Sequence, residues 1–487
     1  MYNDLGVTNM KNLYESEKYL SKKEMMIYGI SNGGQVLGYS IVSSYLMYFY
    51  VNIFTVDAKI ISLIFLIGGI WDIINNPLIG TYIDHRCNHK NKLTSIIRRF
   101  TPFQGITTML IFMGPVFIKS SSATSPVKII YLLITYFLWE FFYSITDVSF
   151  GGLAAVISPN PIERQKAIST ANICVQLSGS LVFLILPLMI DASKSHKLNI
   201  SISNVFLLAG IVAGTIGVGL FSLSGYFVKE RITQHKEKQP IKELVGSVIH
   251  NKPLVLLLTS NLISSFSGIG EAFATYYYLD VLGYASLSII ASTPAFIISI
   301  FSYSLISVAK KHFNNKTILI FSIIFVAADQ FVLFLIGLNN YTNIKIMLPS
   351  IIICNCIVGL FGGILNVLPT EMLTEAADYS EWKNGIRTEG IAFSLKNSVV
   401  KVYGTLAQGF AAFLLSLIGY VSSSSGEIIA QSNDVQRRIW IIFSLTPAIV
   451  RMFSALPIFF YSIVGEKRKR MFEELKIMRE KTDISDC

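Results

Sequence analysis

The sequence predicts an all-α membrane protein with twelve transmembrane helices arranged in two six-helix halves. Three observations support this fold class. The mean hydropathy is +0.55 and only 14% of the residues are charged, whereas a soluble domain usually carries about 25% charged residues. Apolar stretches of membrane-spanning length recur along the whole chain. Lysine and arginine concentrate in alternate connecting segments. Together these features argue against a large soluble α-helical protein.

The apolar stretches indicate where the helices lie. Each has about the length that a helix needs to cross the hydrocarbon core, roughly 20 residues. They cover residues 27–52, 58–83, 100–118, 128–156, 168–191, 203–228, 253–280, 285–308, 317–338, 346–371, 391–420 and 438–465. We therefore expect the 487-residue chain to form one multi-pass membrane protein.

The distribution of lysine and arginine predicts the orientation of these helices. If both termini are cytoplasmic, the inside segments hold 29 of the 40 Lys and Arg residues and the outside loops hold 8. The other three, Lys396, Lys401 and Arg451, lie within helices. This asymmetry follows the positive-inside rule. We expect cytoplasmic termini and a plasma-membrane location, and the net charge of +10 requires no nucleic-acid partner.

The longest cytoplasmic connection predicts the boundary between the halves. Residues 229–252 form a charged linker between an N-terminal half, 27–228, and a C-terminal half, 253–465. Sequence similarity between the halves is too weak to indicate a repeat. Residues 1–26 form a cytoplasmic segment that lacks the apolar region of a signal peptide.

A cytoplasmic tail, 466–487, completes the predicted organisation. It carries many cations beside four apolar residues at helical spacing, Met471, Phe472, Leu475 and Met478. Two interpretations are open: a helix that lies on an anionic leaflet, or a solvated helix.

Ionisable residues inside the predicted helices are the first candidates for function. Each costs about 2.5–3.5 kcal/mol to insert and therefore needs a partner or a wet cavity. At about 1.5 Å per residue, Asp72 lies about 18 Å, Asp147 about 12 Å and Lys401 about 15 Å from the cytoplasmic ends of their helices. Opposite charges at similar depth on different halves predict a cluster. The cluster either serves transport or only ties the halves together.

Further intramembrane charges leave alternatives open. Glu140 lies seven residues before Asp147, hence on nearly the same helix face, and either shares the cavity or bonds a neighbouring helix. Asp329 and Arg451 lie near the centres of their helices, and we expect them to pair within the C-terminal half. All six histidines lie in loops and the cysteines lack metal-site spacing. We therefore expect no metal and no cofactor, and any proton carrier is a carboxylate.

Three stretches carry a resemblance to a known family. Residues 70–80, IWDIINNPLIG, resemble the second-helix motif of the glycoside–pentoside–hexuronide:cation symporters, which belong to the major facilitator superfamily. Residues 135–147 resemble that family's fourth helix, and residues 375–401 resemble the loop into its eleventh. The match runs in the same order from about residue 27 to 465. The resemblance implies secondary transport by alternating access, with the substrate site between the halves.

The resemblance also implies roles for particular residues. The cation-coupling positions are Asp72, Asn76, Ser144, Asp147 and Lys401. The substrate-binding positions are Tyr143, Asp147, Asn172 and Lys401. A cytoplasmic charged gate is implied at Arg164, Glu375, Asp378 and Arg387. Ion pairs that form in one state and break in the other would make such a transporter bistable.

The sequence departs from the family pattern at the expected site. Asn76 replaces one of two cation-site aspartates, which removes an anion that a hard cation would need. This change favours H⁺ coupling through Asp72 or Asp147, with Na⁺ as the other possibility. Sugar-binding residues of the family are replaced at Val36, Gly151 and Asn172. These replacements argue against a galactoside pocket and leave the substrate open.

The sequence thus predicts a sugar or glycoside symporter that works as a monomer on a small molecule within the lipid bilayer. Two alternatives stay open: a lysolipid or other amphiphile carrier of the same fold, and a membrane sensor that has lost transport. The sequence contains no nucleophile elbow, phosphate loop or nucleotide-binding signature. No enzymatic role is therefore expected.

Overall fold

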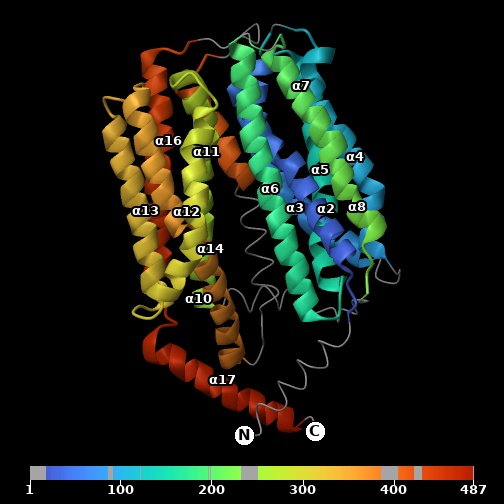
Figure 1. Cartoon of the computed structure of the whole chain (residues 1–487), viewed down its shortest axis with the longest axis vertical. Helices are drawn as coiled ribbons and strands as arrows, with labels where there is room; N and C mark the ends of the chain where they lie inside the picture. Colours follow the sequence, from blue (N-terminus) through green and yellow to red (C-terminus); the bar gives the residue numbers. More distant parts are fainter. Residues whose placement is uncertain are drawn as a thin grey trace. The chain divides into compact units, whose positions relative to one another are not determined.

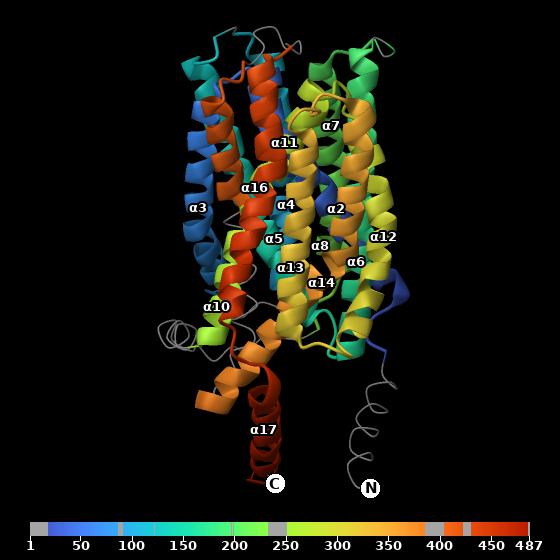
Figure 2. The same ribbon diagram turned by 90° about the vertical axis from the view of Figure 1, so that its left-hand side faces the viewer.

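The computed structural model describes residues 18–85, 91–120, 122–195, 197, 199–231, 251–384, 404–421 and 430–485, and no strand occurs among them. They divide into two compact units. The N-terminal unit is drawn from residues 1–60 and 70–236, and the C-terminal unit from residues 61–69, 237–421 and 429–487. Figure 1 and Figure 2 show the helices of each unit from two directions.

Helices joined by short connections make up the N-terminal unit. In chain order they are α2 (Lys22–Tyr48), the π-helical segment η1 (Phe49–Ile53), α3 (Ala58–His85), α4 (Lys92–Phe117), α5 (Pro126–Val156), α6 (Pro161–Lys194), α7 (Ile202–Val212), the π-helical segment η2 (Ala213–Gly217) and α8 (Val218–Phe227). Residues 61–69 of α3 belong to the C-terminal unit. There the Ser62 hydroxyl donates to the Gly409 carbonyl over 2.9 Å.

The C-terminal unit has the same helical character. Its elements are α10 (Lys252–Ser265), α11 (Gly268–Tyr276), the π-helical segment η3 (Tyr277–Val281), α12 (Leu287–Ala309), α13 (Asn315–Gly337), α14 (Ile344–Asn384), α16 (Asn433–Phe459) and α17 (Gly465–Ser485). Residues 404–417 are also helical. The rest of the predicted stretch 391–420 lies mostly outside the described residues.

The described helices follow the predicted apolar stretches in order, so the all-α membrane class is confirmed. Within the described residues, nine helices are long and apolar enough to cross a membrane. Several helices, among them α4, α6 and α14, are longer than the stretches that predicted them. For example, α14 continues to Asn384, so the segment from Glu375 to Lys383 is helical and is not part of a loop. Hydropathy marks only the part of a helix inside hydrocarbon, whereas its hydrogen bonds continue into polar turns.

Helix starts follow ordinary capping chemistry. The Ser21 hydroxyl accepts a hydrogen bond from the Glu24 backbone N–H at the start of α2. The Ser432 hydroxyl accepts one from the Val435 backbone N–H at the start of α16. Each cap satisfies one of the free N–H groups that a helix leaves in its first turn.

Glycines allow α2 to approach its neighbours closely on two sides. A Cβ on Gly33 would lie 2.7 Å from the Ser178 Oγ of α6. A Cβ on Gly34 would lie 2.5 Å from the Gly217 carbonyl oxygen at the end of η2. Small residues at such positions let membrane helices pack backbone to backbone. Two faces of α2 are therefore covered within the N-terminal unit.

The start of the predicted linker is bound to the N-terminal unit. The Arg231 guanidinium donates to both carboxylate oxygens of Glu24, over 2.9 and 2.7 Å, and to the Ile157 carbonyl. The Lys229 backbone N–H also donates to Glu24. These hydrogen bonds raise the pKa of Arg231. Residues 229–231 thus belong structurally to the N-terminal unit, and the rest of the linker up to 250 lies outside the described residues.

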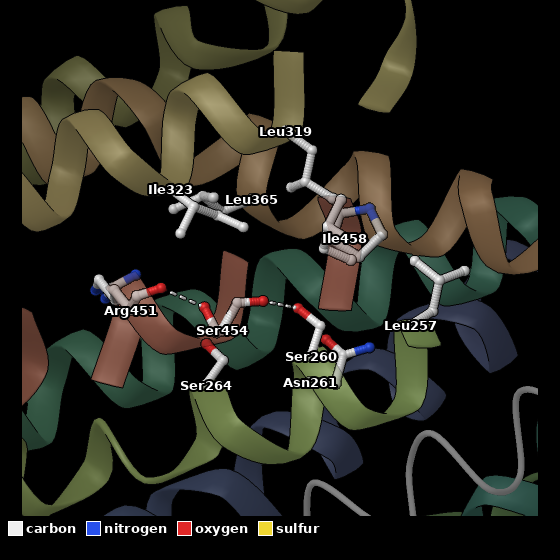
Figure 3. Close-up of a pocket in the computed structure, with 11 residues that line it drawn as sticks. Leu257, Ser260, Asn261, Ser264, Leu319, Ile323, Leu365, Arg451, Ser454 and Ile458 are labelled. Carbon is white, nitrogen blue, oxygen red and sulfur yellow. Dashed lines mark hydrogen bonds between the residues drawn. The ribbon is translucent and has the colours of Figure 1, made fainter. Parts of the chain in front are cut away.

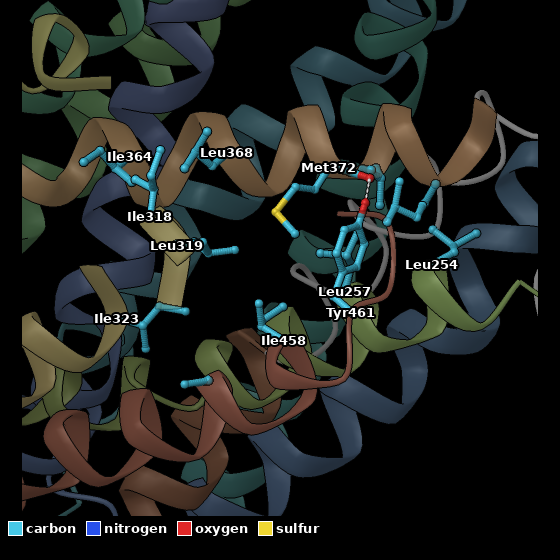
Figure 4. Packing of buried hydrophobic residues seen from close by; sticks show 14 of the residues in the cluster. Leu254, Leu257, Ile318, Leu319, Ile323, Ile364, Leu368, Met372, Ile458 and Tyr461 are labelled. Carbon is cyan, nitrogen blue, oxygen red and sulfur yellow. Dashed lines mark hydrogen bonds between the residues drawn. The ribbon is translucent and has the colours of Figure 1, made fainter. Parts of the chain in front are cut away.

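A continuous hydrophobic core holds the C-terminal unit together (Figure 4). Leu319 of α13, Leu368 of α14 and Ile458 of α16 are among its buried members. Tyr461, just after α16, is 1% exposed, and its hydroxyl donates to the Met372 carbonyl of α14. Burial raises the pKa of Tyr461.

The C-terminal helix α17 packs on this core. Met471 is 0% and Leu475 1% exposed, and Lys467 lies over the Tyr379 ring at 5.1 Å. The prediction of a helix with apolar residues at helical spacing is therefore confirmed. The two interpretations of its apolar face, as lying on a leaflet or as solvated, are wrong for Met471 and Leu475. Figure 1 shows α17 beyond the ends of α10 and α13 of the same unit.

Candidate functional site

One face of α5 carries three of the predicted site residues of the N-terminal unit, together with Glu140. Glu140, Tyr143, Ser144 and Asp147 follow each other at intervals of three, one and three residues. Side chains spaced three, four and seven apart share a helix face. Glu140 is 5% and Ser144 0% exposed, and Asp147 is half-buried. The helix therefore presents a line of polar groups inside the unit.

The structure brings Asp72 to this line. Asp72 lies on α3 and is 0% exposed. Its carboxylate acts electrostatically on Tyr39 and Tyr143, as do the carboxylates of Glu140 and Asp147. Three carboxylates from two helices therefore lie within electrostatic range of the same pair of tyrosines. Both interpretations of Glu140, the shared cavity and the bond to a neighbouring helix, stay predictions.

Aromatic rings form a stack beside the carboxylates. The Tyr39 ring of α2 stacks on Tyr143 with centroids 5.1 Å apart and planes 19° apart. Tyr143 stacks in turn on Trp139, at 5.2 Å and 15°. Tyr136 lies beyond Trp139 at 6.5 Å. The Trp139 indole N–H donates to the Thr108 hydroxyl over 3.1 Å, and this hydrogen bond holds the Trp139 ring against α4.

Two residues of α2 in this site were missed in the sequence. Gln35 is 4% exposed, and its Nε2 donates to the Asp147 Oδ1 over 2.8 Å. Tyr39 lies one turn further along the same face. The sequence does contain an indication of both residues. Gln35 and Tyr39 are four residues apart on one helix face, and an amide buried in hydrocarbon needs a hydrogen-bonding partner.

Other predicted site residues are placed less completely. Asn76 lies one turn after Asp72 on α3 and its side chain is outside the described part, as is the whole of Lys401. A link from Lys401 to the carboxylates stays a prediction. Asn172 is exposed on α6, and Gln176 and Ser180 continue the same polar stripe at four-residue intervals.

The predicted cytoplasmic gate is described only in part. Arg164 is half-buried in the first turns of α6, and Asp378 is 8% exposed on α14. Arg387 lies outside the described residues. Glu375, 4% exposed, binds the Arg468 Nη2 of α17 over 2.7 Å and accepts from Asn315 over 3.1 Å. The gate stays a prediction, while α17 is a partner of Glu375 that the sequence did not reveal.

The expected Asp329–Arg451 ion pair is wrong. Between these two described residues, the recorded ion pairs include no contact within 4.0 Å. The Asp329 carboxylate instead lies near the Cys354 thiol of α14. Arg451 interacts electrostatically with Glu271 and Cys354. Asp329 and Arg451 lie at similar expected depths along their helices. The rotation of each helix about its axis nevertheless places the two side chains apart.

Arg451 lines a small pocket inside the C-terminal unit (Figure 3). Its volume is about 50 Å³, and serines of α10 and α16 contribute to its wall. The Ser454 hydroxyl donates to the Arg451 carbonyl, and the Ser260 hydroxyl donates to the Ser454 carbonyl, each over 2.7 Å. The Ser260 hydrogen bond joins α10 to α16.

No group of three or more His, Cys, Asp or Glu side chains that could hold a metal ion occurs in the part of the chain that the structure describes. The polar groups of the N-terminal unit are instead carboxylates, an amide and phenols. Such groups can exchange protons and bind hydroxyl groups. A multi-pass helical protein with carboxylates and aromatic rings on the inner helix faces of one unit has the features of a membrane transporter.

Comparison with known proteins gives the family. Residues 27–465 match the family described as MFS/sugar transport protein, and the chain belongs to it. The predicted resemblance to the glycoside–pentoside–hexuronide:cation symporters is confirmed, and the protein is a transporter rather than an enzyme.

Similar proteins span nearly the same length. The chain is 25% identical over 448 residues to the isoprimeverose transporter of Lactiplantibacillus pentosus, covering 90% of this chain and 88% of that protein. It is 25% identical over 485 residues to a putative sulfoquinovose importer of Salmonella typhimurium, covering 95% and 94%. The crystal structure of a D-xylose–proton symporter aligns with a TM-score of 0.59 at 13% identity, covering 92% of this chain and 99% of that one. This last likeness shows the fold alone.

Proposed function

We propose that this protein carries a sugar or glycoside across the cell membrane together with a cation, by alternating access. The names of its relatives, an isoprimeverose transporter and a putative sulfoquinovose importer, support a sugar substrate. The observation that carries the proposal is the Gln35–Asp147 hydrogen bond beside the stacked aromatic rings, with the Asp72 and Glu140 carboxylates within electrostatic range. Carboxylates accept sugar hydroxyls and protons, and aromatic faces pack against sugar C–H groups.

The coupling ion in this proposal is a proton, bound by Asp72 or Asp147. Asn76 stands where the family has a second carboxylate, so less negative charge is available to hold Na⁺. A buried carboxylate needs only one proton to become neutral, which lowers the cost of moving it through a membrane. The protein works as a monomer in the plasma membrane with both termini in the cytoplasm, and the lysine and arginine distribution supports this orientation.

Transport in reconstituted vesicles tests the proposal. The purified protein is placed in liposomes, and counterflow is measured with four labelled probes: xylose, glucose, isoprimeverose and sulfoquinovose. Accumulation of the fastest probe is then measured under an imposed proton gradient and under an imposed sodium gradient. We expect counterflow of at least one probe and accumulation under the proton gradient.

Each part of the proposal has its own contrary result. Absence of counterflow for all four probes overturns the sugar substrate. A fluorescent lysophospholipid that crosses the same membrane would then favour the amphiphile carrier. Accumulation under the sodium gradient alone overturns proton coupling. Equilibration without accumulation under either gradient overturns symport.

A further inference from the structure

The face of α2 that bears Gln35 and Tyr39 points to the interior of the N-terminal unit. The glycine contacts cover two other faces of this helix, Gly33 against α6 and Gly34 against η2. Gln35 and Tyr39 lie on the remaining side, and both contact residues of α5. The Tyr39 ring therefore belongs to the inner surface that also carries the carboxylates.

Exposure changes along the aromatic stack. Trp139 is 4% and Tyr143 9% exposed, so these rings are covered on both sides by protein. Tyr39, at the end of the stack, is 40% exposed. An aromatic ring that is fixed from behind by two stacked rings and open in front is a preorganised surface for a planar or flat ligand face.

Polar groups for a ligand lie next to this open ring. Gln35 holds Asp147 by one hydrogen bond to Oδ1, and a carboxylate has acceptor positions on both oxygens. The amide oxygen of Gln35 is a further acceptor. A sugar ring needs both kinds of partner, since its C–H face is apolar and its edge carries hydroxyl donors.

We propose that Tyr39 is the stacking surface for the sugar ring and a determinant of substrate specificity, while the Gln35–Asp147 pair binds the ring hydroxyls. The inference rests on the proposed function and assigns a binding role to two residues of α2. The ligand class is a carbohydrate with at least one continuous apolar ring face. Tyr143 and Trp139 hold the Tyr39 ring in position.

Binding to ring variants tests this assignment. The probe is the sugar with the fastest counterflow among the four named above, so a failure of the proposed function appears before this experiment starts. Its Kd is measured with purified Tyr39→Leu and Tyr39→Phe proteins, and thermal unfolding confirms that each is folded. We expect Tyr39→Leu to raise Kd about three- to tenfold, the size of an aromatic stacking contact, and Tyr39→Phe to stay within about twofold.

A matched control and a second signal make the result specific. Tyr226 of α8 is 56% exposed on the same unit, and Tyr226→Leu should leave Kd unchanged. Trp139 reports from within the stack when the chain's other three tryptophans, Trp71, Trp382 and Trp440, are replaced by Phe. Sugar should then change the Trp139 emission, and Tyr39→Leu should abolish that change at saturating sugar.

Three results would overturn the assignment. The first is an unchanged Kd in Tyr39→Leu. The second is an equal loss in Tyr39→Phe and Tyr39→Leu, because the hydroxyl and not the ring would then carry the contact. The third is an equal loss in Tyr226→Leu, which would show that any exposed tyrosine of this unit affects binding indirectly.

Discussion

The π-helical segments η1 and η3 have similar sequences and lie in different units. η1 follows Tyr48 and has the sequence FYVNI, and η3 follows Tyr276 and has the sequence YYLDV. In the N-terminal unit, η1 follows directly on α2, which begins at Lys22. In the C-terminal unit, η3 follows on α10 and α11, the first of which begins at Lys252. The same aromatic, aliphatic and polar residue types recur at the same positions. The units therefore share a local repeat that sequence comparison of whole halves did not reveal.

The same positions differ in chemistry. Asn52 of η1 is an amide, whereas Asp280 of η3 is an acid that accepts a hydrogen bond from the Tyr420 hydroxyl over 2.7 Å. The difference extends to the interiors of the units. Carboxylates of the N-terminal unit act electrostatically on the stacked tyrosines, whereas the half-buried Asp329 and Arg451 of the C-terminal unit lie near the Cys354 thiol. The proposed binding surface thus lies in the N-terminal unit, and the C-terminal unit places different charged groups among its helices.

The largest expected effect contrasts one aspartate from each unit. Asp72→Asn should lower proton-driven accumulation of sugar by about tenfold or more, because an amide cannot bind and release the coupling proton. Asp329→Asn, its matched control, should keep most of the accumulation because Asp329 contacts Cys354 and lies outside the proposed site. Uptake into vesicles measures both. Equal losses in the two variants would break the contrast between the units.

A second prediction concerns packing in the N-terminal unit. Gly34→Ala should destabilise the protein by about 1–3 kcal/mol, because the new Cβ would lie 2.5 Å from the Gly217 carbonyl oxygen. Gly219→Ala on the neighbouring α8 is the control, since a Cβ there meets nothing within 4 Å. Thermal unfolding in detergent measures both variants. A lower unfolding midpoint for Gly219→Ala than for Gly34→Ala would contradict the described approach of α2 to η2.

A third prediction concerns the C-terminal unit and its helix α17. Arg468→Gln removes the ion pair with Glu375, whose side chain is 5% exposed while that of Arg468 is 42% exposed. Because the arginine is partly solvated, we expect a loss of only about 1 kcal/mol, seen as faster proteolysis of α17. Arg470→Gln removes an exposed pair with Glu474 and should leave the proteolysis rate unchanged. Protection of α17 in both variants would show that Met471 and Leu475 alone hold it.

The smallest expected effect is a pH dependence at α17. Hydrogen bonds from Arg470 and from the Trp382 indole lower the pKa of Glu474 below its ordinary value of 4.5. A lowered pKa means that this contribution is fully present above pH 4.5 and is lost as the pH falls through the lower folded-state value. Trp382 emission should therefore change only in that acid range. The Glu474→Gln variant should not show the change, and a transition near neutral pH would count against this pair.

Much of the site could be predicted because it depends on properties of single helices. Asp72 and Asp147 stand out since a charge in hydrocarbon is costly wherever it occurs. The relation of Glu140 to Asp147 follows from seven-residue spacing on one helix. Neither argument needs to know which helices are neighbours. Roles for Asn76, Lys401 and the gate residues rest on family resemblance and stay predictions.

Interaction partners could not be predicted from the sequence when the two residues lie on different helices. Asp329 and Arg451 have similar depth, yet Cys354 lies beside Asp329 in place of the arginine. The partner of Glu375 that the structure describes, Arg468 of α17, was not among the residues of the expected network, which stays a prediction. Depth along a helix follows from residue number, but the direction of a side chain depends on how each helix is rotated in the packed unit.

The sequence by itself determined the membrane class, the order of the helices and the buried acids Asp72 and Asp147, because hydropathy and helical spacing are local properties. Tertiary structure alone decided that Tyr39 stacks on Tyr143, that Gln35 holds Asp147 and that α17 packs on the C-terminal core. Each of these contacts joins residues far apart in the chain. Their geometry is set by close packing of helices at glycine contacts and buried apolar faces, which no single helix encodes.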